Sequence, residues 1–87
     1  MTRMINKGVI EMKALKVTFK NTEEILEFVK KVEKYPYPMD LKDGSIMIDA
    51  KSLLGLINLG CDRVATLVVH ADEHTELCHD IEKFIVA

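Results

Sequence analysis

The three histidines of the sequence lie in its last third, and one of them is spaced to share a helix face with a cysteine. His74 and Cys78 are four residues apart, so a helix would place one above the other. Imidazole and thiolate groups are ligands that zinc prefers, and His70 or His79 could supply a third ligand. The alternative interpretation is structural, since Cys78 continues an apolar stripe on which a free cysteine behaves as a small hydrophobic residue. We expect the structural role, with no metal and no cofactor.

Ser52 is the hydroxyl whose position is most typical of a helix start. It follows Lys51 and precedes a short apolar stretch that Gly60 ends. A serine at this place accepts a hydrogen bond from the backbone of the first turn, which stabilises a helix by about 1 kcal/mol. If the helix packs through Leu56 and Leu59, its other apolar side chains face partly outward. We therefore predict that Ser52 caps a short helix that is not buried on all sides.

Composition excludes several classes of protein. The chain has 48% hydrophobic and 30% charged residues, the balance of a globular domain. Twelve basic and 14 acidic residues give a net charge of -2, which argues against a nucleic-acid binder. No apolar run approaches the roughly 20 residues that cross a bilayer, and Arg3, Lys7 and Glu11 prevent a signal-peptide core. We expect a cytoplasmic protein in which Cys61 and Cys78 are free thiols.

The first third of the chain predicts a strand and then a helix. Apolar and polar residues alternate over Leu15–Phe19, the period of a half-buried strand. Asn21 followed three residues later by Glu24 is typical of a helix start, so we expect a helix at Thr22–Lys34. Pro36 disfavours helical geometry at the preceding residue and ends it. The apolar residues of this helix form one stripe: Ile25, Leu26, Phe28, Val29 and Val32.

The remaining sequence predicts a hairpin, a short helix, a central strand and a last helix. We expect strands at Met39–Leu41 and Ser45–Ile48 around a turn at Lys42-Asp43-Gly44, and a third helix introduced by Asp72. The other elements are expected at Ser52–Leu59 (helix), Val64–Val69 (strand) and Thr75–Ile85 (helix). The order βαββαβα predicts an α+β fold with three helices on one face of a four-stranded antiparallel sheet.

One segment resembles the signature of a known family. Lys51–Gly60, K-S-L-L-G-L-I-N-L-G, resembles the K-S-h-x-G-h-x-x-L-G pattern (h is apolar) of HPr, the histidine-containing phosphocarrier of the bacterial sugar phosphotransferase system. Glu27–Val32, E-F-V-K-K-V, is similar to the end of that family's first helix. The resemblance covers about Leu15–Ile85. It implies a bacterial HPr-like open-faced β-sandwich at residues 14–87, behind an N-terminal extension at residues 1–13.

The loop that carries the chemistry of HPr is missing. In that family a G-h-H-A-R-P-type loop joins the first strand to the first helix, and its histidine accepts the phosphoryl group. The corresponding junction here, Val17–Glu24, has no histidine, arginine or proline and is several residues shorter. Asn21 and Thr22 occupy its place, and we interpret them as residues that cap the helix. The resemblance therefore implies the scaffold of HPr with no catalytic residue.

Two properties of the resembling family concern the second helix. The serine of its K-S pair is a regulatory phosphorylation site in many Gram-positive bacteria, so Ser52 is a candidate for regulation. A phosphate there would lie at the positive end of the helix, although Asp49 would repel it. Leu53, Leu54 and Ile57 match positions at which family members expose an apolar patch to partner proteins. The alternative for these three side chains is partial burial under a neighbouring loop or the N-terminal segment.

We predict an HPr-like regulatory or partner-binding domain without catalytic activity. Its second helix would bind a protein, either a phosphotransferase-system or regulatory protein or a second copy of the chain, and we expect no nucleic acid and no membrane as partner. A first alternative is a genuine phosphocarrier that uses another histidine, His70 or His74. A second alternative is a small metal-binding protein with ligands from His70, His74, Cys78 and His79.

Overall fold

The computed structural model describes residues 12–86, which form a four-stranded antiparallel sheet and three α-helices. The strands lie in the order β1-β4-β2-β3, and each neighbouring pair is antiparallel. The elements are β1 (Met12–Thr18), α1 (Thr22–Val32), β2 (Met39–Asp43), β3 (Ile46–Asp49), α2 (Leu53–Leu59), β4 (Val64–His70), α3 (Thr75–Asp80) and a 3-10 helix (Glu82–Phe84). The predicted α+β fold and its βαββαβα order are confirmed.

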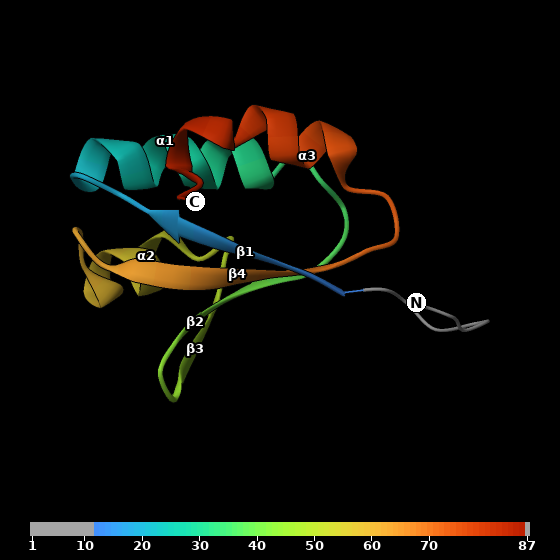
Figure 1. The fold of residues 1–87 in the computed structure, drawn as a ribbon. Helices are drawn as coiled ribbons and strands as arrows, with labels where there is room; N and C mark the ends of the chain where they lie inside the picture. Colours follow the sequence, from blue (N-terminus) through green and yellow to red (C-terminus); the bar gives the residue numbers. More distant parts are fainter. Residues whose placement is uncertain (1–11, 87) are drawn as a thin grey trace.

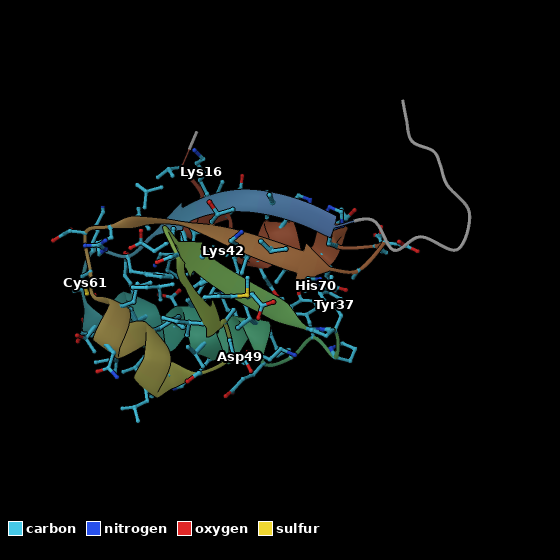
Figure 2. All side chains as sticks on the ribbon, turned by 90° about the horizontal axis from the view of Figure 1, so that it is seen from below. Lys16, Tyr37, Lys42, Asp49, Cys61 and His70 are labelled. Atoms are coloured by element: carbon cyan, nitrogen blue, oxygen red, sulfur yellow. The ribbon has the colours of Figure 1, made fainter. Side chains whose placement is uncertain are left out.

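The helices and the sheet form two layers. In Figure 1, α1 and α3 lie side by side over one face of the sheet, and α2 packs against α1 and β3. The opposite face of the sheet carries Lys16, Lys42 and His70 (Figure 2). Burial alternates along β4 because successive side chains of a strand point to opposite faces. Among the described helices, none is long and apolar enough to cross a lipid bilayer.

All three phenylalanines of the chain meet in the core and form one phenylalanine cluster (Phe19, Phe28 and Phe84). Their ring centroids are 4.9 to 5.7 Å apart, with the rings tilted or edge to face. Such aromatic pairs contribute about 0.5–1.5 kcal/mol beyond the burial of their area. The three rings come from the residue directly after β1, the middle of α1 and the 3-10 helix, so the cluster joins the two ends of the described chain.

The hairpin turn lies one residue later than the sequence predicts. Asp43 still pairs with Ile46 in the ladder, so the two turn residues are Gly44 and Ser45 rather than Lys42-Asp43-Gly44. Gly44 has a φ of +63°, which the first position of a type II′ hairpin turn requires. The carboxylate of Asp43 also accepts a hydrogen bond from Arg63 Nε at 2.7 Å. This contact with the start of β4 favours Asp43 as a strand residue.

The last helix is shorter than the prediction of Thr75–Ile85. α3 ends at Asp80, and the chain continues as a 3-10 turn that places Phe84 in the core. Beyond it, Ile85 bridges Val17, and the N–H of Val86 donates to the carbonyl of Lys16 at 2.9 Å. A continuous α-helix could not make these contacts with β1, and tertiary packing therefore ends the helix early.

Other elements are of the predicted type but begin or end at different residues than the sequence predicts. α1 stops at Val32, two residues before the predicted end, and β1 begins at Met12, which pairs with His70 at the end of β4. His74, rather than Asp72, lies directly before α3. Residues 1–11, which belong to the predicted N-terminal extension, lie outside the described residues.

α2 approaches β3 more closely than a side chain at its contact point would allow. A Cβ added to Gly55 would lie 2.6 Å from Cγ2 of Ile48, well inside van der Waals contact. Gly55 is therefore required by packing, although glycine is normally unfavourable inside a helix.

We predict that Gly55→Ala destabilises the protein. Alanine normally stabilises a helix by about 1 kcal/mol relative to glycine, but the collision with Ile48 should outweigh this and give a net loss of about 1–2 kcal/mol. Urea unfolding measures the change. Ile48→Ala removes the colliding methyl group, so Gly55→Ala should cost less in that background. A stabilising Gly55→Ala would show that the approach of α2 to β3 is not constrained.

Candidate functional site

α2 begins at the residue that the sequence indicates. Ser52 has an extended backbone, and its Oγ accepts a hydrogen bond from the N–H of Gly55 at 3.1 Å. Its carbonyl accepts from the N–H of Leu56 at 3.0 Å. Ser52 thus receives the first two hydrogen bonds of the helix, and its predicted role as N-cap is confirmed.

The predicted binding residues lie on a helix with one buried and one exposed side. We call Leu53, Leu54 and Ile57 the α2 patch. Leu54 is 71% exposed and Ile57 is 41% exposed, whereas Leu56 is fully buried. These two exposed residues are three positions apart and share one face of the helix. The expected difference between Leu53 and Leu59 is not seen, since both are half-buried and pack against the core.

Lys51 holds the start of α2 in a way that sequence reasoning missed. Its Nζ donates to the backbone carbonyl of Tyr35 at 2.5 Å, and its N–H donates to Oδ1 of Asp49 at 2.9 Å. The ammonium therefore points to the segment after α1 rather than to Ser52. No sequence signal could have found this contact, because its acceptor is a backbone carbonyl 16 residues away.

Tyr35 also makes a side-chain contact with a distant segment. Its hydroxyl donates to Oδ2 of Asp80 on α3 at 2.5 Å, and Lys34 Nζ lies 3.2 Å from the same oxygen. The hydrogen bond to Asp80, together with burial, raises the pKa of Tyr35 well above its ordinary value. The hydrogen bonds from Tyr35 and Lys34 lower the pKa of Asp80. This contact links the segment after α1 to the last helix.

The junction before α1 is occupied by capping contacts. Asn21 Oδ1 accepts from the N–H of Glu24 at 2.9 Å, and Glu24 Oε1 accepts from the N–H of Lys20 at 2.9 Å. This reciprocal arrangement is close to a capping box. Asn21 is confirmed as the N-cap of α1, and Thr22 is the first residue of the helix.

His70 lies far from the junction before α1. His70 ends β4, and its Nε2 is 3.0 Å from Oδ2 of Asp40 on β2. The other end of β4, Val64, pairs with Thr18 just before α1. The seven residues of β4, from Val64 to His70, span roughly 20 Å, so His70 is remote from the start of α1. Figure 2 shows His70 at the opposite end of the sheet from Cys61, which follows α2.

The structure does not assemble the residues of the metal-binding alternative. His74 lies at the start of α3, and its buried Nδ1 has no hydrogen-bond partner among residues 12–86. His79 is exposed near the end of that helix, and Cys78 is half-buried. In this part of the chain, no three His, Cys, Asp or Glu side chains lie close enough together to hold a metal ion. Cys61 and Cys78 are both free thiols.

The chain matches no family model, no curated protein and no solved structure in three comparisons with known proteins. Its likeness to HPr stays a prediction, drawn from the sequence at positions 51–60 and from the order of the elements.

We predict that acid removes the contribution of Asp80 to stability. Its folded pKa lies below the unfolded value of about 3.9, so the contribution is complete above that pH and is lost as the pH falls through the folded pKa. Asp80→Asn should therefore destabilise the protein at neutral pH and cost progressively less at acid pH, as the pH falls through the folded pKa of Asp80. Denaturant unfolding at neutral and at acid pH measures this difference. An equal cost at both would mean that the ionised carboxylate is not the stabilising group.

Proposed function

We propose that this protein is an HPr-like domain without catalytic activity that binds a partner protein through the α2 patch. The observation that carries the proposal is the exposure of Leu54, the most exposed of the large apolar residues among those described. Ile57 lies three positions further along the same face of the helix, and the half-buried Leu53 directly precedes Leu54. Clustered apolar side chains on a surface often mark interaction sites. The partner class that the resemblance suggests is a phosphotransferase-system or regulatory protein.

The size of the patch suits a transient contact. Burying a Leu or Ile side chain contributes about 1.5–3 kcal/mol, and association itself has a cost of several kcal/mol or more. Three such side chains contribute at most about 9 kcal/mol before this cost, so alone they support only a weak contact. A permanent complex would need additional surface.

Two observations support a role without phosphoryl transfer. The polar groups at the start of α1 are engaged by Asn21 and Glu24 in capping, and no histidine is present in this junction. His70, one histidine of the phosphocarrier alternative, is roughly 20 Å away along β4 and contacts Asp40. A phosphoryl group on a histidine would also need a nearby positive group or helix start to hold its oxygens.

Ser52 is the proposed site of regulation. A phosphate on its Oγ would add negative charge at the N-terminus of α2, where the helix dipole favours it. It would also displace the Oγ from its hydrogen bond with Gly55 and lie close to the carboxylate of Asp49. Because Ser52 directly precedes the α2 patch, such a charge would alter the surface that the partner contacts.

We predict that Leu54→Glu abolishes partner binding and leaves stability within about 0.5 kcal/mol. Leu54 is exposed, and an acidic residue in the first turn of a helix is favoured by the dipole. The measurement is affinity purification from the cytoplasm of the source cell, with Val64→Glu as control because Val64 is 55% exposed on β4. Sedimentation of both variants tests self-association. A severe loss of stability in Leu54→Glu would place this residue in the core and refute the binding patch.

We also predict that the protein does not accept phosphoryl groups. Incubation with phosphoenolpyruvate and the first enzyme of the phosphotransferase system should give no acid-labile phosphate, since the junction before α1 offers no histidine. A genuine HPr in the same reaction is the positive control. Acid-labile phosphate that disappears in His70→Ala or His74→Ala would establish the phosphocarrier alternative instead.

A further inference from the structure

Lys51, Tyr35 and Asp80 form a polar chain that joins the start of α2 to α3. Lys51 donates to the carbonyl of Tyr35, and the hydroxyl of Tyr35 donates to the carboxylate of Asp80. Tyr35 thus uses its backbone toward one helix and its side chain toward the other. The contacts span 16 and 45 positions of the sequence, so neither is a consequence of local structure.

Tyr35 is fixed between these two contacts. Its N–H donates to the carbonyl of Val32 at the end of α1 at 3.1 Å, and its ring packs against the core. The ring of Tyr37 lies 5.8 Å away, measured between centroids. The following Pro36 restricts the backbone of Tyr35 further. The contacts with Lys51 and Asp80 therefore meet in one residue whose backbone and ring are both held in place.

Lys51 is the residue directly before the N-cap of α2. The next residue, Ser52, receives the N–H groups of Gly55 and Leu56, which are the first hydrogen bonds of the helix. α2 has only seven residues and one fully buried side chain, Leu56. A helix this short is unstable alone and relies on its tertiary contacts.

We propose that Lys51, Tyr35 and Asp80 act as one unit that positions the first turn of α2, so that a change at Asp80 on α3 alters the order of the α2 patch. These are positioning residues, because none of them belongs to the patch itself. The inference rests on the proposed function only in taking α2 as the binding helix. It identifies the surface around Asp80 as a second place from which partner binding can be changed.

Amide hydrogen exchange of the full chain tests whether these three residues act as a unit, and it needs no partner protein. Tyr35→Phe keeps the ring and the carbonyl but removes the hydroxyl, and it should speed exchange at Gly55 and Leu56 by about tenfold, the effect of losing one hydrogen bond to a charged group. The amide of Leu67 in the central strand β4 reports global unfolding, and the rates are expressed relative to it. Asp80→Asn removes the charge but keeps an acceptor oxygen, so it should give a smaller increase, and the double variant should exchange no faster than Tyr35→Phe alone.

The control and a further variant make the outcome decisive. Glu27→Gln is the matched control, since Glu27 contacts Lys83 at 3.0 Å on another part of the surface, and it should leave the relative rates unchanged. Lys51→Met should speed the same two amides even where a Tyr35 variant folds poorly. Additive effects of Tyr35→Phe and Asp80→Asn, or unchanged relative exchange rates in both variants, would overturn the proposal that these residues act as one unit. Either result leaves the Leu54→Glu test of partner binding unaffected.

Discussion

The phenylalanine cluster is the constraint on which the rest of the structure depends. Phe19 comes directly after β1, Phe28 from the middle of α1 and Phe84 from the 3-10 helix, and the three rings must meet in one place. The chain therefore turns sharply between β1 and α1, and its last residues return to the first strand. Each ring contributes burial of about 1.5–3 kcal/mol in addition to its contacts with the other two. The early end of α3 follows from the same requirement.

Features set by neighbouring residues were predictable from the sequence, and features set by distant contacts were not. Asn21 and Ser52 were identified as caps because a cap depends on residues only three positions away. The hairpin turn lies later than predicted because the strand continues through Asp43, which pairs with Ile46, while Lys42 pairs with Thr66 of β4. The local pattern cannot indicate this pairing with β4. The helix predicted to reach Ile85 ended early because β1 binds the end of the chain. The bounds of elements, rather than their type or order, therefore carried the errors.

For the same reason, the exposure of some residues of the candidate site could be predicted from the sequence and that of others could not. The exposure of Leu54 and Ile57 and the burial of Leu56 follow from helical periodicity, which the sequence contains. The partial burial of Leu53 depends on how the helix is oriented against the core, and periodicity does not determine that. Gly55 lies inside α2, where glycine is normally unfavourable, and in the structure it is the point at which α2 meets Ile48. This close approach lets a short helix attach to the sheet while one side remains exposed.

The attachment of the chain end to β1 also bears on how the fold would respond to mechanical load. Ile85 and Val86 contact Val17 and Lys16 in antiparallel fashion, so the terminal segment runs back along β1 toward Met12. A tension applied between Met12 and Val86 would therefore peel these contacts apart one after another instead of shearing them together. Release of that segment would draw Phe84 out of the core. Under stretching, the C-terminal segment should therefore detach first, while β4 is still paired with β1 and β2.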